Sequence, residues 1–274
     1  MSQCKIIAIA NQKGGVGKTT TTFNLGVALA KQKKKVLLVD IDPQSNLTTY
    51  AGWYDQDKLV LTLTDLMKQS ISDMPIQTEE CILHHDEGID LIPSNLDLAA
   101  MESSLAYAMS REYCVKNCLD SVKDNYDYIL LDCQPSLGML TINALACANS
   151  VIIPVQSQYF ATKGMTELLK TVNKMKRQIN KELKIDGALL TLVDRRTNLS
   201  KEIERQIVEN YGSILKLFNT QIPLAVKTAE STASGNSIFA YDKNNKVAEA
   251  YSSFAKEVLE VGKINTKHAP TKVR

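Results

Sequence analysis

The sequence predicts an α/β protein built on a doubly wound, mostly parallel sheet with helices on both faces. Three observations lead to this fold class. Short, continuous apolar runs recur along the chain, segments with helical periodicity lie between them, and the first run leads directly into a glycine-rich loop and a helix. Continuous apolar runs are typical of strands buried on both faces of a parallel sheet. Their alternation with helices indicates consecutive βαβ units.

Six apolar runs are predicted to form the strands. They are Lys5–Ala10, Lys35–Asp40, Ile89–Pro93, Tyr128–Asp132, Val151–Val155 and Ala188–Val193. Each run is far shorter than the roughly 18 apolar residues that a membrane-spanning helix requires. We therefore expect these segments to build a buried sheet and not to cross a membrane.

Helices are predicted where apolar residues recur every three or four positions. Such segments are Thr19–Lys31, Thr62–Ser70, Thr162–Arg177, a stretch after Asn198, and Val247–Val261. This spacing places the apolar side chains on one face of each helix, which can then pack on the sheet. We expect a single domain over residues 1–262, followed by a basic, flexible tail over residues 263–274.

Composition and charge are those of a globular protein with an uneven charge distribution. The 274 residues are 44% hydrophobic and 23% charged, and the formal net charge is +2. Residues 1–159 carry 12 basic and 18 acidic residues, whereas residues 160–274 carry 20 basic and 12 acidic ones. A basic half can attract polyanions even when the whole chain is nearly neutral. No signal-peptide pattern opens the sequence, so we expect a cytoplasmic protein.

The loop between the first strand and the first helix has the composition of a phosphate-binding loop. Residues 11–20 read Asn-Gln-Lys-Gly-Gly-Val-Gly-Lys-Thr-Thr. Glycines let backbone N–H groups point at phosphates, the helix N-terminus adds positive potential, and a lysine neutralises the outer phosphates. The expected nucleotide-binding residues are Lys13, Gly14, Gly15, Val16, Gly17, Lys18, Thr19 and Thr20. The usual first glycine of the P-loop pattern is replaced by Gln12, and Lys13 is an additional lysine.

Acidic residues end two of the predicted strands. Asp40 and Asp42 follow the second apolar run at alternate positions, and Asp132 ends the run from Tyr128. Alternate residues of an extended segment point to the same side, so Asp40 and Asp42 can both face the phosphate site. An aspartate after an apolar strand is the Walker B layout, in which Asp132 holds Mg²⁺. The alternative for Asp42 is that it only caps the turn before Pro43.

The Lys-Gly-Gly-x-Gly-Lys-Thr pattern resembles the deviant Walker A motif of the ParA/MinD superfamily of P-loop NTPases. The resemblance implies an ATPase that uses ATP and Mg²⁺ with slow intrinsic turnover. It implies that Lys13 and Lys18 contact the phosphates, with Lys13 reaching the nucleotide of a partner subunit in a sandwich dimer. Asp42 would position or polarise the attacking water, and Thr19, Asp40 and Asp132 would hold or support Mg²⁺. A second cation near the transferring phosphoryl group stabilises developing charge, so hydrolysis would depend on dimerisation.

Within the superfamily, the sequence most resembles the small ParA/Soj-type partition ATPases. The matching stretches are residues 11–21, 36–46, 132–138, Thr141 with 143–145, 153–156 with Tyr159, 196–199, Ile222-Pro223, Gly235 and Tyr241-Asp242. This resemblance implies an ATP-dependent homodimer that binds double-stranded DNA non-specifically and is stimulated by a ParB-type centromere-binding protein. The cargo would be a plasmid, a mobile element or a chromosome, and the protein would associate with the nucleoid.

The resemblance also implies roles for residues in the basic half. Arg195, Arg196 and Lys227 would contact DNA, and Pro223 would line the adenine side of the nucleotide site. Five positions depart from the family pattern. Gln134 replaces the first of two prolines after the Walker B segment, Lys227 replaces a more usual arginine, Leu224 stands where an arginine often lies, and Ser231-Thr232 replaces Ala-Pro. A lysine contacts phosphate as a point charge without the arginine fork, so we expect weaker DNA contacts.

Other readings of the same motifs remain open. A MinD-like, membrane-associated positioning ATPase shares the phosphate loop, although the tail after Lys263 makes a poor interfacial helix. Iron–sulfur reductases and small-molecule ligases of the superfamily are further alternatives. Cys133 and Cys147 do not form a recognisable cluster-binding motif. A nucleotide-binding module without hydrolysis follows if Asp42 is dispensable.

Overall fold

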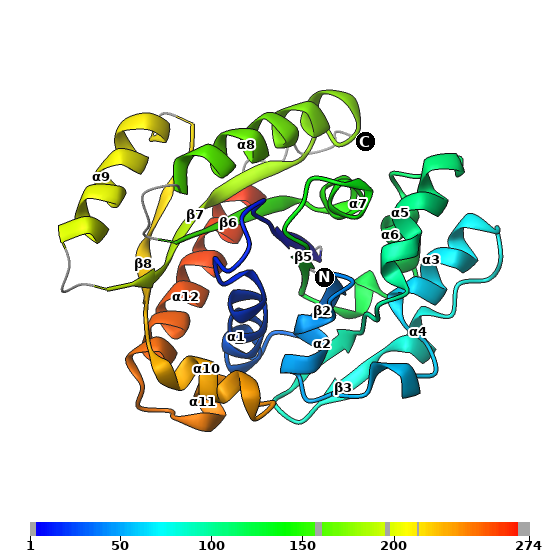
Figure 1. The fold of residues 1–274 in the computed structure, drawn as a ribbon, viewed down its shortest axis with the longest axis horizontal. Helices are drawn as coiled ribbons and strands as arrows, with labels where there is room; N and C mark the ends of the chain where they lie inside the picture. Colours follow the sequence, from blue (N-terminus) through cyan, green and yellow to red (C-terminus); the bar gives the residue numbers. More distant parts are fainter. Residues whose placement is uncertain (1–3, 157–160, 195–197, 213, 268–274) are drawn as a thin grey trace.

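An eight-stranded, mostly parallel sheet forms the centre of the protein. The computed structural model describes residues 4–156, 161–194, 198–212 and 214–267 (Figure 1). The strands lie in the order β3-β4-β2-β5-β1-β6-β7-β8, and the described strand pairs are parallel except for β3 with β4. Their bounds are β1 Lys5–Ile9, β2 Val36–Ile41, β3 Leu83–His85, β4 Ile89–Ile92, β5 Tyr128–Cys133, β6 Ser150–Gln156, β7 Lys184–Val193 and β8 Leu217–Pro223.

Helices cover both faces of this sheet. They are α1 Lys18–Lys31, α2 Asn46–Tyr50, α3 Leu63–Ile71, α4 Thr78–Cys81, α5 Leu98–Tyr107, α6 Cys114–Asp120, α7 Met139–Cys147, α8 Ala161–Gln178, α9 Asn198–Tyr211, α10 Val226–Ala233, α11 Ile238–Tyr241 and α12 Lys246–Lys267. Two short 3₁₀ turns occupy Gln56–Lys58 and Lys123–Asn125. None of the helices in the described part of the chain is long and apolar enough to cross a membrane.

The alternation of side chains along the strands produces two hydrophobic cores. In β1, Ile7 and Ile9 belong to the core that packs against α1 and α12, whereas Ile6 and Ala8 belong to the core beneath α3, α5, α6, α7 and α8. Figure 1 shows these two helix layers on opposite sides of the sheet. Because both faces are covered, the strands read as continuous apolar runs.

The position of β1 in the sheet determines where a ligand can bind. β1 lies between β5 and β6. The connection from β1 runs through α1 on one face of the sheet and leads to β2, whereas the connections from β5 and β6 run through α7 and α8 on the other face and lead to β6 and β7. Such a switch point leaves a crevice at the carboxyl ends of the strands. The register places Asp40 of β2 directly beside Asp132 of β5, and Ile9 of β1 on the other side of Asp132.

The predicted fold class is confirmed, with differences in individual elements. Each of the six predicted strands is present, but β7 begins at Lys184, and neither β3 nor β8 was predicted. The centre of β8 is polar, with Asn219, Thr220 and Gln221, so it lacks the continuous apolar run of the other strands. Helix α12 extends to Lys267, past residue 262. The division into a domain and a basic tail stays a prediction.

Candidate functional site

The loop from β1 to α1 has the backbone geometry of a phosphate cradle. Gly15 and Gly17 have φ values of 70° and 81°, a left-handed conformation that favours glycine. Gly17 is the N-cap of α1, so the free N–H groups of this 14-residue helix face the loop. A Cβ atom added to Gly14 or Gly15 would meet nothing within 4 Å. These glycines therefore border open space into which a ligand fits.

Contacts with two neighbouring strands and one contact within the loop fix the shape of this loop. The Asn11 side-chain amide donates a hydrogen bond of 2.7 Å to the Pro154 carbonyl at the end of β6. The Lys13 backbone N–H donates to Asn11 Oδ1 at 3.0 Å. The Thr191 hydroxyl of β7 donates to the Val16 carbonyl at 2.8 Å. The loop is thus preorganised by β6 and β7 before any ligand binds.

Lys18 is the cation at the centre of the site. Its side chain is buried, and Nζ donates to the Lys13 carbonyl at 3.1 Å, so it folds back over the loop. Burial lowers the pKa of Lys18, and the nearby charges of Asp132 and Asp42 oppose this shift. A buried ammonium at the bottom of a glycine loop is well placed to receive an anion, as the sequence predicts.

Asp132 connects the end of β5 to the first turn of α1. One carboxylate oxygen accepts a hydrogen bond of 2.7 Å from the Thr19 hydroxyl, and the other accepts one of 3.3 Å from the Thr22 hydroxyl. The Asp132 side chain is fully buried, and burial together with the charge of Asp40 raises its pKa. The two predicted metal-binding residues Thr19 and Asp132 therefore already touch each other.

Asp40 lies beside Asp132 and is held by the segment that follows it. Its Oδ2 accepts hydrogen bonds from the Thr48 backbone N–H at 2.9 Å and from the Thr48 hydroxyl at 2.8 Å. Its Oδ1 accepts the Asp42 N–H at 3.2 Å. Burial raises the pKa of Asp40, and the charge of Asp42 adds to this effect. Three carboxylates thus gather at one edge of the sheet.

Asp42 is mostly buried, and it also caps a turn. Its Oδ1 accepts the Gln44 N–H at 3.0 Å, and its carbonyl accepts the Ser94 hydroxyl at 3.0 Å. The turn-capping alternative is therefore observed, but the same carboxylate also influences Asp40, Asp132 and Lys18 electrostatically. Capping and proximity to the phosphate loop occur together in this residue.

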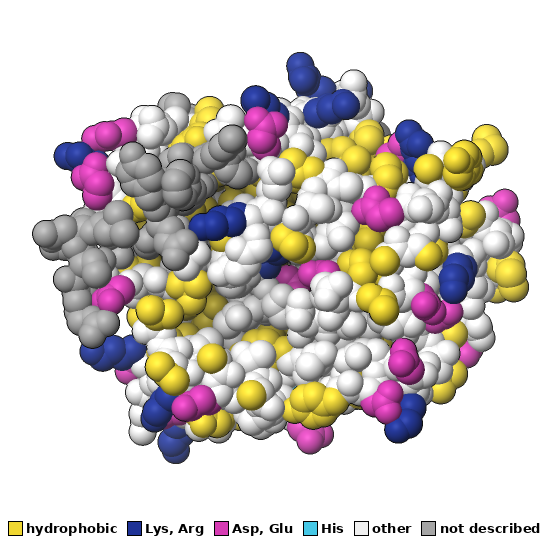
Figure 2. Space-filling view, in the orientation of Figure 1, with side chains coloured by type: hydrophobic (Ala, Val, Ile, Leu, Met, Phe, Trp, Pro, Cys, Tyr) yellow, Lys and Arg dark blue, Asp and Glu magenta, His cyan; other side chains and the backbone are white. Residues whose placement is uncertain are grey.

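The residues at this edge fit a magnesium nucleotide. Mg²⁺ prefers oxygen ligands from one or two carboxylates, with the remaining positions taken by phosphate and water. Asp132, Asp40 and the Thr19 hydroxyl supply such oxygens, and Lys18 supplies positive charge for the phosphates. The raised pKa values of the two aspartates are what adjacent buried carboxylates show without a cation. Figure 2 shows acidic and basic side chains meeting in the hollow at the centre of this face.

The remaining predicted site residues lie at different distances from this centre. Lys13 is half-buried in the loop, and Thr20 is in the first turn of α1. Pro223 ends β8 and pairs with Val193 of β7, at the same edge of the sheet. Lys227 is exposed on α10, and its Nζ forms an ion pair of 2.7 Å with Asp242. Arg195 and Arg196 lie outside the described residues.

Sequence reasoning missed the residues that support the acids. Thr48 and Ser94 hold Asp40 and Asp42, and Ser94 N–H also donates to the Thr48 hydroxyl at 3.0 Å. Thr48 lies in the short helix α2 and Ser94 lies in the loop after β4, and neither carries a distinctive motif. Only the position of each residue shortly after a strand end hints at such a role.

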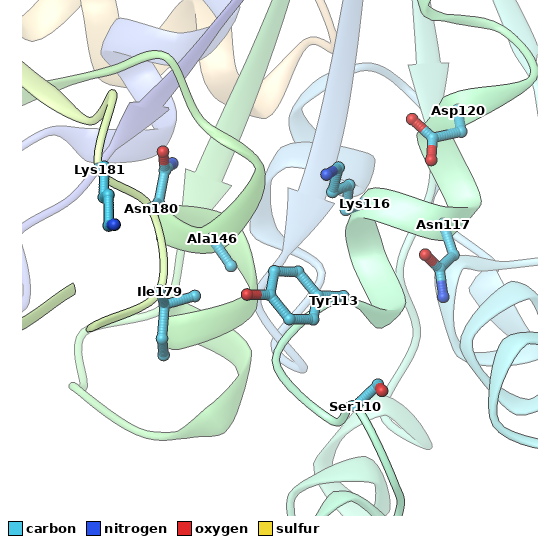
Figure 3. A pocket seen from close by; sticks show the side chains of 9 residues that line it. All are labelled: Ser110, Tyr113, Lys116, Asn117, Asp120, Ala146, Ile179, Asn180 and Lys181. Carbon is cyan, nitrogen blue, oxygen red and sulfur yellow. The ribbon is translucent and has the colours of Figure 1, made fainter. Parts of the chain in front are cut away.

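A second hollow lies at the opposite edge of the sheet. It has a volume of about 640 Å³ and lies between α6, the end of α7 and the turn after α8 (Figure 3). Tyr113 points into it from one side and Ile179 from the other, with Lys116 and Lys181 at the rims. It is separate from the phosphate loop and contains none of the predicted site residues.

The cradle, the buried lysine and the acid at the end of the neighbouring strand together define the class of P-loop nucleotide-binding proteins. Residues 4–185 accordingly match the family model described as an AAA domain. The sporulation initiation inhibitor protein Soj of Bacillus subtilis is 43% identical over 262 residues, covering 94% of this chain and 99% of Soj. The chromosome partitioning protein ParA of Caulobacter vibrioides is 37% identical over 259 residues, covering 93% of this chain and 94% of that protein.

Solved structures show the same fold. The crystal structure of cobyrinic acid a,c-diamide synthase from Mycobacterium smegmatis with bound ATP analog and magnesium matches with a TM-score of 0.83 and 35% identity. The match covers 96% of this chain and 97% of that one. Together with the sequence relatives, these findings show that the chain belongs to the Soj/ParA family of P-loop ATPases.

Proposed function

We propose that this protein is a partition ATPase that hydrolyses ATP with Mg²⁺, pairs as an ATP-bound homodimer and binds DNA non-specifically in the cytoplasm, on the nucleoid. A ParB-type partner would stimulate its slow hydrolysis. The observation that carries the proposal is the gathering of Lys18, Thr19, Asp132, Asp40 and Asp42 around one glycine loop that also contains Lys13. The names of its relatives, which are partitioning proteins, support the biological role.

Each residue of the site would have its own role in ATP binding or hydrolysis. Lys18 and the N–H groups of the loop would bind the β- and γ-phosphates, and Gly14 and Gly15 leave room for this approach. Thr19 and Asp132 would hold Mg²⁺, supported by Asp40, and the bound ion would neutralise charge on the phosphates. Asp42 would orient the attacking water. Pro223 would border the adenine.

Lys13 would give the site its dependence on dimerisation. It precedes Gly14 in the loop and is half-buried, so it lies at the rim of the cradle and not at its centre. A lysine that reaches a partner's phosphates stabilises transition-state charge only when two subunits face each other. Binding of ATP would then favour dimerisation, and dimerisation would favour DNA binding.

The DNA surface would lie in the basic half of the chain. Residues 160–274 contain 20 basic and 12 acidic residues, and they include Arg195, Arg196 and Lys227. Non-specific DNA binding is driven by neutralisation of phosphates and weakens steeply with salt. We expect this binding to need ATP, because only the dimer presents two such surfaces together.

DNA binding across a salt series tests this function. The Asp42→Ala protein would be mixed with a fluorescent duplex of unrelated sequence in ATP, in ADP and without nucleotide, each with Mg²⁺. We expect tight binding only with ATP, a linear loss of affinity with log salt, and loss of binding in Arg196→Glu with its ATP affinity unchanged. Equal binding in all three nucleotide states would contradict the proposal.

Sedimentation with anionic vesicles, run in parallel, distinguishes the MinD-like alternative from a partition ATPase. ATP-dependent binding to vesicles without binding to DNA would favour a membrane-associated positioning ATPase. ATP-dependent binding to DNA alone supports partition.

A further inference from the structure

A half-buried glutamate holds the segment that leaves the Asp132 strand. Glu102 lies on α5, and its carboxylate accepts three hydrogen bonds. Oε1 accepts the side-chain amide of Gln134 at 2.9 Å and the Leu140 N–H at 3.3 Å, and Oε2 accepts the Met139 N–H at 2.9 Å. We call Glu102 with these three partners the Glu102 clamp.

The clamp fixes both ends of the loop between β5 and α7. Gln134 is two residues after Asp132, and Met139 and Leu140 are the first residues of α7. A carboxylate at the start of a nine-residue helix satisfies free N–H groups and interacts favourably with the helix dipole. A Cβ atom added to Gly138 would lie only 2.5 Å from Glu102 Oε1, so the loop backbone passes very close to the carboxylate.

The chain just before α5 also contacts the loop between β2 and α2, which contains Asp42 and is called the Asp42 loop. Ser94, which precedes α5, donates its hydroxyl to the Asp42 carbonyl at 3.0 Å and its N–H to the Thr48 hydroxyl at 3.0 Å. Thr48 in turn holds Asp40. Residues 94–102 therefore touch the loop that follows Asp40 at one end and the loop that follows Asp132 at the other.

We propose that Glu102 is a positioning residue for hydrolysis, which sets the path of the loop after Asp132 relative to the Asp42 loop. The inference rests on the proposed ATPase function. Gln134 takes the place of a proline in the family pattern, and proline has no side-chain donor, so the amide contact is a feature of this chain. Neither Glu102 nor Gln134 touches the phosphate loop in the described contacts, so their effect acts through the two loops.

Two substitutions and a matched control test the clamp. Glu102→Gln keeps the shape of the side chain but replaces one carboxylate oxygen by an NH₂ group. This NH₂ group cannot accept the hydrogen bonds that the clamp's N–H donors make to that oxygen. Gln134→Met keeps the length and removes only the contact to Glu102. Glu112→Gln removes an equal charge at a nearby residue that pairs with Arg111 outside the clamp. Each protein is measured for steady-state kcat, ATP dissociation constant, thermal unfolding and amide hydrogen exchange of residues 134–141.

We expect Glu102→Gln to lower kcat about ten- to hundredfold, because small displacements of catalytic groups cost this much. Its ATP dissociation constant should stay within about twofold, since the phosphate loop is held by β6 and β7. Exchange of the Met139 and Leu140 amides should become faster. Gln134→Met should lower kcat by a smaller factor, and Glu112→Gln should match wild type in every measurement.

Several outcomes would contradict the proposed role of Glu102 in hydrolysis. One is a kcat of Glu102→Gln equal to wild type; another is a loss of kcat matched by an equal loss of ATP affinity, which indicates general damage. Wild-type turnover in Gln134→Met would show that the loop after Asp132 is not what Glu102 positions. Absence of turnover in the wild-type protein itself, with or without the partner, would instead contradict the proposed ATPase.

Discussion

At the scale of single residues, the dominant feature is a pair of buried carboxylates. Asp40 and Asp132 lie side by side in the register of β2 and β5, and both side chains are fully buried. Burial raises the pKa of Asp40 to about 7 and that of Asp132 to about 8. Their charged forms are therefore disfavoured in the free protein, and a bound cation would relieve this cost.

This pair predicts a pH dependence with a definite sign. Because the folded pKa values lie above the unfolded value near 4, these groups cost the free protein stability as pH rises from about 4 to about 8. Binding of Mg²⁺ and ATP should release protons in the same range, so Mg²⁺ affinity should increase with pH. Calorimetric titration at pH 7 in buffers of different ionisation enthalpy measures the release. Asp132→Asn should release fewer protons, and a buffer-independent heat for the wild type would contradict the prediction.

Asp42 should be needed for hydrolysis and not for binding. The Asp42→Asn protein keeps the shape of the side chain and its cap on the Gln44 N–H, but it loses the negative charge. We expect ATP affinity within a few fold of wild type and turnover reduced about 10²- to 10⁴-fold, as for loss of a general base. Single-turnover hydrolysis with radiolabelled ATP measures this directly. Turnover near the wild-type rate would leave Asp42 with only its turn-capping role.

The sequence predicted the residues of the site better than their supports. Gly15, Gly17, Lys18 and Asp132 carry a motif because phosphate and metal chemistry requires those residue types at that spacing. Glu102 is distant from them in sequence and lies on the short helix α5, which carries no motif. Its role depends on how α5 packs beside α7, which no local pattern records.

At the scale of elements, two short helices form the surface on which Lys227 lies. The Lys227 ammonium pairs with Asp242 at 2.7 Å, and the Tyr241 hydroxyl donates to Glu230 at 3.0 Å, so α10 and the end of α11 are linked twice. The hydrogen bond with Asp242 raises the pKa of Lys227 and lowers that of Asp242. In the proposed function, a DNA phosphate would have to compete with this carboxylate for the lysine.

Asp242→Asn should therefore strengthen DNA binding. The substitution frees Lys227, and one added phosphate contact steepens the plot of log affinity against log salt by about 0.9. Glu230→Gln is the matched control, because it adds the same charge to the same pair of helices and frees no lysine. Fluorescence anisotropy over a salt series in ATP compares the two. Equal slopes in both variants would show that Lys227 does not contact DNA.

The two edge strands, β3 and β8, could not be predicted from local sequence patterns. β8 has a polar centre, and it is held to the sheet by its buried Phe218 and Ile222 and by α12. The Glu257 carboxylate of α12 accepts the N–H groups of Asn219 and Thr220 at 2.9 and 2.7 Å. These contacts come from a residue distant in sequence, so local apolar content could not predict the strand. β3 has only three residues, too few to carry a periodic signal.

At the scale of the whole molecule, the nucleotide site lies open on one face. The carboxyl ends of the strands converge there, and Figure 2 shows the hollow with charged side chains at its centre. Lys13 lies in the phosphate loop, which is held by hydrogen bonds of Asn11 Oδ1 with the Lys13 N–H and of the Thr191 hydroxyl with the Val16 carbonyl. Such an open site can be closed by a second copy of the chain that faces the first. In the proposed function, ATP-dependent dimerisation depends on Lys13 completing the partner's phosphate site.

Light scattering coupled to size-exclusion chromatography tests this dependence most directly. The Asp42→Ala protein, in which turnover is blocked, would be run with Mg²⁺ and ATP, with ADP and without nucleotide. We expect twice the chain mass of 30.3 kDa only in the sample with ATP, and a return to the single-chain mass when Lys13→Ala is added. A single-chain mass under saturating ATP, or a dimer that forms equally well without Lys13, would contradict it.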